Sequence, residues 1–310
     1  MAVPEAAQGI TAVVVTYNPD PARLAQLCQA VQPQVEHVVL VDNGSSTEAV
    51  TALQALVAAP SSALTLLALG ENRGIGAAQN AGIVLARQHG SRYVLLLDHD
   101  SIPEAGMVAT LRAAIENQPA GSPPVAAAGP RYADARQTTN PSPFVQLEGF
   151  KRVRCECQHA GQLIEVEHLI ASGSLIPMAV LDAVGDMDER LFIDYVDIEW
   201  CLRAAHAGYR MLGVCDARMQ HELGDTPIRF MGKHLPDHSP LRHYYLFRNA
   251  LLLQRMPHIG WRWKVVDAYQ TVMKYGFYAL VATPRLPRIR MMNRGLWDGL
   301  LGRGGAYQPR

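Results

Sequence analysis

Residues 93–101 read YVLLLDHDS, and this stretch changes abruptly from an apolar run to two carboxylates that are one residue apart. Apolar residues without polar alternation are typical of a central parallel strand that is covered on both faces. In open α/β sheets, ligands bind at the carboxyl ends of such strands. The pattern therefore predicts that Asp98 and Asp100 lie in a polar site at the end of a buried strand.

The two carboxylates offer the hard oxygen ligands that Mg²⁺ and Mn²⁺ prefer. In proteins Mg²⁺ commonly binds through one or two carboxylates, while substrate phosphates and water fill its remaining positions. A metal-bound phosphate compound is therefore the expected ligand. The alternative is that the pair only caps a following helix, for which Pro103-Glu104 is a suitable start.

Composition places the chain among ordinary globular proteins, with 310 residues, 49% hydrophobic and 18% charged. This length suits one large α/β domain or two smaller ones. The sequence has no charged segment followed by a short apolar one, and no run of about 18 apolar residues. Neither a secretion signal nor a membrane span is predicted, and a cytoplasmic location is expected.

The cysteines are five in number and scattered, which argues against a framework of disulfide bonds. Cys155, Cys157 and His159 lie close together in the sequence. A closed structural zinc site needs four ligands, usually with two or more residues between paired cysteines. A zinc site is therefore not expected here.

A formal net charge of zero conceals an uneven distribution. From Arg242 onward there are 12 Lys and Arg against two Asp and Glu, whereas residues 1–241 contain 16 against 26. A strongly basic C-terminal segment is expected to meet an anionic surface. Because zinc-finger and aromatic RNA-binding motifs are absent, a membrane surface is favoured over nucleic acid. A solvated basic face is the alternative.

Strand-like and helix-like segments alternate through the first hundred residues. Strands are predicted at 10–16, 37–41, 64–68 and 93–97, with helices at 21–31, 48–58 and up to about 89. This alternation predicts a parallel sheet, and right-handed crossovers place the carboxyl ends of its strands at one edge. Residues 16–18, 42–44 and 98–100 are therefore expected to converge on one pocket.

Two common nucleotide-binding motifs are absent. No G-x-G-x-x-G follows the first strand and no Walker A sequence occurs, so a dinucleotide dehydrogenase and a P-loop NTPase are poorly supported. A sugar-nucleotide pyrophosphorylase would carry a glycine-rich loop with Arg and Lys after the first strand. The sequence TYNP at 16–19 does not match that loop.

Five motifs are instead VTYNP at 15–19, VDNGS at 41–45, ENRGI at 71–75 with Asn80, LDHDS at 97–101 and FIDYVDIEWCLR at 192–203. Together they resemble glycosyltransferase family 2, and specifically its rhamnosyltransferase branch. The resemblance covers most of the chain. It implies an α/β protein with the GT-A type nucleotide-diphospho-sugar transferase fold, a mixed and mostly parallel sheet flanked by helices.

The same resemblance implies an enzyme that transfers a sugar with inversion and depends on a divalent metal, Mg²⁺ or Mn²⁺. The expected donor is dTDP-L-rhamnose, and the acceptor is a hydroxyl of a glycan or lipid-linked glycan in cell-surface polysaccharide synthesis, such as O-antigen. UDP-galactofuranose and UDP-glucose are alternative donors. A non-catalytic nucleotide-sugar-binding scaffold is an alternative of another class, although it would be expected to lose Asp100 or Asp197, and both are present.

Residue by residue, the resemblance assigns a donor site and a metal site. Asp100 is the expected direct metal ligand, His221 completes the metal site, and Asp98 lies near the ribose or the metal. The alternatives are a plain turn for Asn72 and Gly74 and a lone surface histidine for His221. The implied donor-binding residues are Thr16, Tyr17, Asn18, Asp42, Asn43, Asn72, Gly74, Asp98 and Gly173.

For catalysis, the family motif aligns its catalytic aspartate with Asp197, while Val196 replaces the glutamate that usually precedes it. Asp194 is the rival. If both aspartates are helical they share a face, with Asp197 as general base and Asp194 as acceptor contact. Capping of a helix N-terminus is the alternative for either acid. The implied acceptor or diphosphate contacts are Trp200, Arg203, Arg242, Tyr244 and Arg248.

Domain boundaries follow from these motifs. Residues 1–235 are expected to form the catalytic domain, with a nucleotide-sugar half to about 130 and an acceptor half at about 131–235. Within the latter, strands are predicted at 169–176 and 209–214, and 131–167 have no predicted fold. Residues 236–310 are predicted to form a basic, mainly helical extension. Its amphipathic part, 262–291, suits either a membrane interface or packing on the catalytic domain. A peripheral location at the inner face of the cell membrane and a homo-oligomer are both compatible with this pattern.

Overall fold

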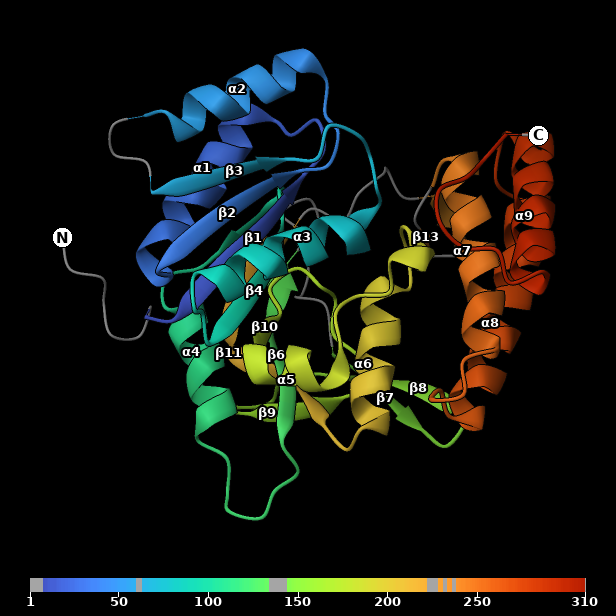
Figure 1. Ribbon diagram of the computed structural model, residues 1–310. Helices are drawn as coiled ribbons and strands as arrows, with labels where there is room; N and C mark the ends of the chain where they lie inside the picture. The colour runs from blue at the N-terminus through green and yellow to red at the C-terminus, as the bar shows by residue number, and fades with distance from the viewer. Residues whose placement is uncertain are drawn as a thin grey trace.

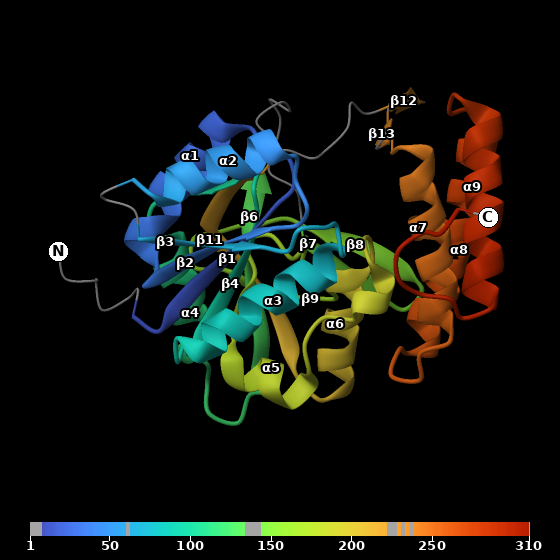
Figure 2. The same ribbon diagram turned by 45° about the horizontal axis from the view of Figure 1, so that its top comes forward.

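The computed structural model describes residues 8–59, 63–133, 144–221, 228–230, 233–235 and 238–309. Within these residues the main sheet has nine strands, in the order β3-β2-β1-β4-β10-β6-β11-β5, with β9 paired to β11. Helices cover both faces of this sheet, and a group of C-terminal helices lies beside it (Figure 1; Figure 2).

The N-terminal half of the sheet is parallel, as predicted. Its strands are β1 (Ile10–Thr16), β2 (His37–Asp42), β3 (Leu64–Ala68) and β4 (Tyr93–Asp98), joined by helices α1 (Pro21–Val31), α2 (Thr47–Val57) and α3 (Ile75–Gln88). Thr16 pairs with Asp42, and Val15 pairs with Asp98. The predicted convergence of these strand ends at one edge is confirmed.

Burial on both faces explains why these strands lack polar alternation. Val13 and Val15 belong to one hydrophobic cluster, whereas Val14 belongs to a second cluster on the opposite face. Successive side chains of a strand point to opposite faces, so both sets of positions must be apolar when helices cover both sides.

The second half of the sheet is mixed in direction. Strand β6 (Val125–Ala133) runs parallel to β11 (Arg210–His221), while β10 (Leu175–Pro177) is antiparallel to β4 and β6. Strand β11 is also antiparallel to β9 (Leu163–Val166) and to β5 (Ser101–Pro103). The last pairing sets His221 opposite Ser101, directly after the two aspartates. Helices α4 (Met107–Glu116), α5 (Met178–Val184) and α6 (Val196–His206) connect these strands, and β7 (Phe144–Glu148) pairs with β8 (Lys151–Cys155).

Three local predictions are wrong. Pro103 ends strand β5, and helix α4 begins only at Met107, so the aspartate pair does not cap a helix that starts at Pro103. The predicted strand at 169–176 shrinks to β10, because the residues before it form a turn. A disulfide bond joins Cys157 to Cys215, 58 residues apart, against the expectation drawn from scattered cysteines.

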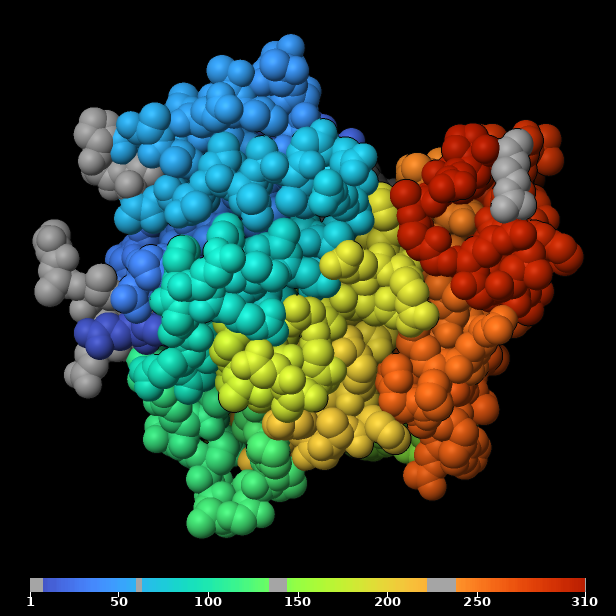
Figure 3. Space-filling view, in the orientation of Figure 1, coloured from blue at the N-terminus to red at the C-terminus, as the bar shows by residue number. Residues whose placement is uncertain are grey.

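The C-terminal segment is helical, as predicted. It contains α7 (Pro240–Gln254), α8 (Trp261–Leu280) and α9 (Arg285–Leu300), preceded by the short strands β12 (Ile228–Phe230) and β13 (Lys233–Leu235). Figure 3 shows this orange and red lobe beside the yellow segment around α6. Ala250, Leu253 and Trp263 share the hydrophobic cluster of the sheet, so the extension packs on the catalytic domain. None of the helices in the described residues combines the length and apolar character needed to span a bilayer.

Candidate active site

A cavity of about 580 Å³ opens where the strand ends converge. Its walls come from the strand ends of β1, β4 and β11, from the loop before α6, and from helices α7 and α8 of the extension. Its lining includes donor candidates Tyr17, Asn43, Asn72 and Gly74, the group Asp98, Asp100 and His221, the acids Asp194 and Asp197 with Arg242, and the group Arg152, Asp267 and Lys274.

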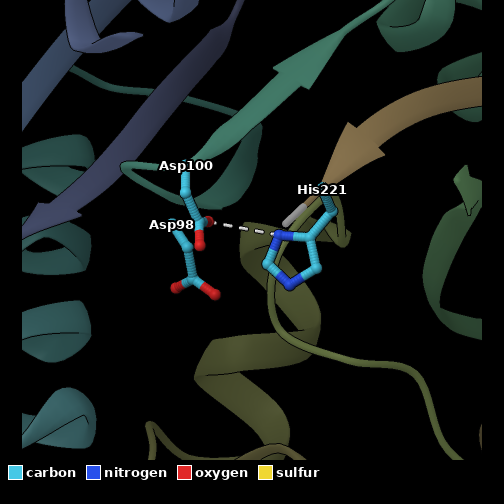
Figure 4. Close-up of side chains that lie close together, drawn as sticks. All are labelled: Asp98, Asp100 and His221. Atoms are coloured by element: carbon cyan, nitrogen blue, oxygen red, sulfur yellow. Dashed lines mark ion pairs between the residues drawn. The ribbon is translucent and has the colours of Figure 1, made fainter. Parts of the chain in front are cut away.

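Asp98 ends β4, Asp100 lies in the turn between β4 and β5, and His221 ends β11. Figure 4 shows the three side chains close together. Their possible ligand atoms all lie within 4.8 Å of one another, and Asp100 Oδ1 is 3.2 Å from His221 Nδ1. Two carboxylates and an imidazole form a donor set that suits a divalent cation. These three side chains can therefore hold such an ion together with oxygens of a ligand.

Two serines orient this group. Ser101 Oγ lies 2.7 Å from His221 Nδ1 and 2.7 Å from Ser172 Oγ, and Ser172 Oγ accepts a hydrogen bond from the Asp98 amide at 3.0 Å. Hydrogen bonds of this kind fix the direction of metal ligands. Sequence analysis missed both serines, although Ser101 directly follows the aspartate pair.

Electrostatics also favours a cation at this place. Burial raises the pKa of Asp98, and the neighbouring charge of Asp100 raises it further. Burial would likewise raise the pKa of Asp100, but the hydrogen bond and charge of His221 outweigh it and lower that pKa. Bound cations are often the largest local charges in such sites, and one placed here would stabilise both carboxylates.

Asp42 and Thr16 organise the loop after β2 instead of lining the cavity. Asp42 is only 1% exposed, and its Oδ2 accepts hydrogen bonds from the amides of Gly44 at 3.2 Å and Ser45 at 3.1 Å. Its Oδ1 accepts from the Thr16 hydroxyl at 3.3 Å. Asn18 is outside the lining as well, and its Oδ1 accepts from the Ser46 amide. In this structure Thr16, Asn18 and Asp42, which were predicted to contact the donor, therefore stabilise the loop after β2.

Tyr17, Asn43, Asn72 and Gly74 do line the cavity. Tyr17 is 49% exposed, so its ring is free to stack on a planar group. Asn43 and Asn72 are joined by an amide hydrogen bond of 3.3 Å. Gly74 has φ +89°, and a Cβ there would lie 2.5 Å from the Phe192 carbonyl oxygen, so only glycine allows this contact with the loop before α6.

Gly173 was predicted to bind the donor, but in this structure it packs against Pro130. Its φ is +87°, and a Cβ would lie 2.6 Å from Pro130 Cγ. It does not line the cavity. Close packing against Pro130, rather than approach of the backbone to a donor, explains this glycine.

Asp197 lies in the first turn of α6, beside the metal candidates. Its Oδ1 accepts a hydrogen bond from the Ile198 amide at 2.9 Å and its Oδ2 accepts from the Ala171 amide at 3.3 Å. Burial raises the pKa of Asp197 to about 6, and the charges of Asp194 and Asp98 act in the same direction. A carboxylate with a pKa near neutrality is suited to accept a proton.

Asp194 has another environment. It precedes α6 with φ +63°, so the expectation that the two aspartates share a helix face is wrong. Arg242 of α7 pairs with it, with Nη2 3.0 Å from Oδ1 and Nε 3.2 Å from both oxygens. The Arg242 guanidinium therefore fixes the position of the Asp194 carboxylate.

Comparison with known proteins decides the family. The model of glycosyl transferase family 2 matches residues 11–159. The dTDP-rhamnosyl transferase RfbF of Shigella flexneri is 34% identical over 304 residues, covering 96% of this chain and 98% of that protein. The chain belongs to glycosyltransferase family 2. The galactofuranosyltransferase GlfT1 of Mycobacterium tuberculosis (strain CDC 1551 / Oshkosh) is 26% identical over 303 residues, covering 94% of this chain and 93% of its own.

Solved structures confirm the fold of this glycosyltransferase. Staphylococcus aureus TarS 1–349 in complex with UDP-GlcNAc matches with a TM-score of 0.57 at 15% identity, covering 95% of this chain and 81% of that chain. GalNAc-T7 with UDP, GalNAc and Mn²⁺ matches with a TM-score of 0.59 at 14% identity, covering 90% of this chain and 58% of that chain. The predicted GT-A type architecture is thereby confirmed.

Four predicted contact residues of the glycosyltransferase lie outside the cavity lining in the part of the chain that is described. Trp200 donates to the Gly185 carbonyl, and Arg203 pairs with buried Glu199. Tyr244 donates to Asp298, while Arg248 is 0% exposed and donates to backbone carbonyls. In this structure these four side chains stabilise packing, whereas Arg242 lines the cavity.

Sequence analysis missed the residue that holds the loop before α6. Asn249 is buried on α7, and its amide nitrogen donates to the carbonyls of Leu191, Ile193 and Asp194 at 2.8, 2.8 and 2.9 Å. The partners are at least 55 residues apart. No local sequence signal announces such contacts, although the motif FRNA on a predicted helix shows a polar pair among apolar residues.

Proposed function

We propose that this glycosyltransferase transfers L-rhamnose from dTDP-L-rhamnose to a hydroxyl of a glycan or lipid-linked glycan in cell-surface polysaccharide synthesis. The observation that carries the proposal is the 34% identity to a dTDP-rhamnosyl transferase across 96% of the chain. The cluster of Asp98, Asp100 and His221 at the cavity supports it, because a nucleoside diphosphate needs a cation beside its phosphates.

In this proposal Asp100 and His221 hold Mg²⁺ or Mn²⁺, and Asp98 completes the site or contacts the ribose. The bound ion would neutralise charge on the departing nucleoside diphosphate. Tyr17 stacks on the base, while Asn43, Asn72 and the backbone at Gly74 contact the rest of the donor. Asp42 and Thr16 contribute by keeping the loop after β2 in place.

Inversion follows from a single displacement in this proposal. Asp197 accepts the proton of the acceptor hydroxyl as its oxygen attacks the anomeric carbon, opposite the leaving diphosphate. The pair of Asp194 and Arg242 contacts the acceptor. Support comes from the different environments of the two acids, since burial raises the pKa of Asp197 to about 6 whereas Asp194 is paired with Arg242.

The comparison with GlfT1 supports an alternative donor. The relation to galactofuranosyltransferase GlfT1, at 26% identity over 94% of the chain, makes UDP-galactofuranose the main competitor. A non-catalytic scaffold is disfavoured, because the chain keeps both Asp100 and Asp197 in one cavity.

We also propose that the enzyme associates with the inner face of the cell membrane through α8 and α9. Both acidic residues beyond Arg242, namely Asp267 and Asp298, are buried, whereas Arg262, Arg285 and Arg290 are exposed. Large apolar side chains are exposed beside these cations: Trp261, Val265, Tyr269, Val272, Met273, Leu280, Leu286 and Trp297. An apolar stripe flanked by cations suits the interface of an anionic bilayer.

A donor screen tests the proposed reaction. Protein, Mg²⁺ or Mn²⁺ and a glycolipid acceptor are incubated with dTDP-L-rhamnose, UDP-galactofuranose or UDP-glucose, and release of nucleoside diphosphate is measured with and without chelator. We expect fastest metal-dependent release from dTDP-L-rhamnose. Faster release from a UDP sugar would replace the donor, and no release from any of the three would oppose the reaction itself.

A further inference from the structure

The cavity continues beyond Asp194 to a group of charged side chains for which the proposed function has no role. Arg152 of β8 and the pair Asp267 and Lys274 of α8 line this part. Asp267 Oδ1 accepts a hydrogen bond of 3.0 Å from the Tyr195 hydroxyl, which anchors the group to the residue before α6. Asp267 and Lys274 lie far beyond the residues 11–159 that match the family model.

Much of the hydrogen-bonding capacity of this group is unused. Arg152 Nε and Nη2 and Asp267 Oδ2 are buried and have no hydrogen-bond partner among the described residues. The nearest carboxylate oxygens to Arg152 Nη2 are Glu167 Oε1 at 3.6 Å and Asp267 Oδ1 at 3.9 Å, longer than hydrogen bonds. Asp267 is 1% exposed and lines the cavity, so its carboxylate is shielded from bulk solvent. Buried polar groups left unpaired cost stability, which points to a ligand that pairs them.

The charges indicate what kind of ligand fits. Two cations, Arg152 and Lys274, lie near the carboxylates Asp267 and Glu167. Within the described residues both oxygens of buried Glu167 also lack a hydrogen bond, and Arg152 is an ion-pair partner at 3.6 Å. A phosphate would be attracted by the cations but repelled by the carboxylates. A sugar hydroxyl instead donates to a carboxylate and accepts from a guanidinium or ammonium group, so it uses both kinds of partner at once.

We infer that Arg152, Asp267 and Lys274 form a subsite that binds a neutral sugar unit of the acceptor glycan through its hydroxyl groups. The position suits the acceptor, because Asp194 and Asp197 line the same cavity as this group and the metal candidates, and Tyr195, which donates to Asp267, directly follows Asp194. This inference rests on the proposed function, since it assigns the second substrate of the same cavity.

The test uses three neutral probes: the methyl glycosides of L-rhamnose, D-galactose and N-acetyl-D-glucosamine. Their dissociation constants are measured by saturation-transfer NMR on the full chain with dTDP and Mg²⁺ present, so that the donor site is occupied. The variants are Lys274→Met and Asp267→Asn. Arg262→Met is the matched control, because Arg262 lies on the same helix but is exposed and outside the cavity lining.

We expect saturable binding of at least one glycoside by the wild type, weakened at least about tenfold in both variants and unchanged in Arg262→Met. The dTDP affinity should be the same in all four proteins, which shows that the variants are folded. Two findings would overturn the inference: equal glycoside binding by the variants, or no binding of any probe by the wild type. Displacement of a bound glycoside by millimolar inorganic phosphate would likewise overturn it in favour of an anion site.

Failure of the proposed function is distinguishable in the same samples. If dTDP-L-rhamnose neither binds nor turns over in wild type and control, the donor assignment fails. The glycoside measurements on the Asp267 and Lys274 variants would still test the subsite independently of the donor.

Discussion

Two aspartates three residues apart differ in chemistry because their surroundings differ. Asp197 has only backbone amides as hydrogen-bond donors, and burial raises its pKa to about 6. Asp194 is paired with a guanidinium. A carboxylate with a pKa near neutrality is suited to act as a general base, which is the role proposed for Asp197.

The first prediction compares Asp197→Asn with Asp194→Asn. Asp197→Asn should lower kcat at least about a hundredfold, because the acceptor hydroxyl loses its proton acceptor, while donor affinity stays near that of the wild type. Asp194→Asn should act mainly on the KM of the acceptor. Steady-state kinetics with both substrates varied separates these effects. Normal turnover by Asp197→Asn together with an inactive Asp194→Asn would reverse the two roles.

The second prediction concerns pH. Asp197 is active when ionised, and its pKa is about 6, so kcat/KM should fall on acidification below about pH 6 and level off above it. About a tenth of the sites are ionised one pH unit below the pKa, so the rate at pH 5 should be about a tenth of the plateau. A flat profile between pH 5 and 7.5 would contradict the assignment. Asp194→Asn serves as control: it should keep the acidic limb, displaced to lower pH because the charge of Asp194 contributes to the raised pKa of Asp197.

At the scale of elements, helix α7 holds the loop that carries Asp194 and leads into Asp197 on α6. Phe192, Asp194 and Tyr195 all have positive φ, a conformation that costs non-glycine residues free energy. The amide of Asn249 binds three carbonyls of this segment. Arg248 shares one of them, that of Leu191, and binds the Arg190 carbonyl as well. Such loops persist only where their surroundings determine them, so α7 is part of the active-site scaffold.

The third prediction is that Asn249→Ala lowers both stability and turnover. Three carbonyls lose a donor, which should reduce the free energy of unfolding by about 1–3 kcal/mol. The loop should then lose its fixed geometry, so kcat should fall more than donor affinity. Denaturant unfolding and kinetics measure the two effects. Gln254→Ala is the matched control, since it removes an amide on the same helix that binds the Lys264 carbonyl of α8; equal losses of kcat in both variants would count against the account.

Sequence alone predicted those elements whose pattern is local. Strands β1 to β4 follow from apolar runs that are buried on both faces, and Asp98 and Asp100 from their position at a strand end. His221 was predicted only through the family resemblance. The predicted helix start at Pro103 was wrong, because a proline is tolerated in an edge strand as well as at the start of a helix. Contacts between distant segments carry no local signal, which is why the Cys157–Cys215 disulfide, Asn249 and Arg152 were missed.

At the scale of the whole molecule, helix α8 has two working faces. Asp267 and Lys274 face the cavity, whereas Trp261, Val265 and Val272 are exposed on the outside. A single helix therefore links the expected acceptor end of the cavity to the proposed membrane surface. This arrangement suits an acceptor whose lipid lies in the bilayer while its glycan enters the protein.

The fourth prediction is that the full-length protein binds vesicles containing anionic phospholipid and binds neutral vesicles more weakly. Each cation near the surface contributes about 1 kcal/mol, and added salt should weaken the interaction. Val272→Glu should reduce binding, because it places a negative charge in the exposed apolar stripe. Val84→Glu, at an exposed site on α3, is the control. Equal sedimentation of all three proteins with the vesicles would contradict the proposed surface.

The central claim is that a divalent metal held by Asp100, His221 and Asp98 joins the protein to a dTDP-sugar diphosphate at the sheet edge. Calorimetric titration of dTDP-L-rhamnose into wild type and Asp100→Ala, with Mg²⁺ or with chelator, tests it most directly. We predict that the metal tightens wild-type binding at least about tenfold, or about 1.4 kcal/mol, and has no effect on Asp100→Ala. Equal wild-type affinity with Mg²⁺ and with chelator would contradict the claim.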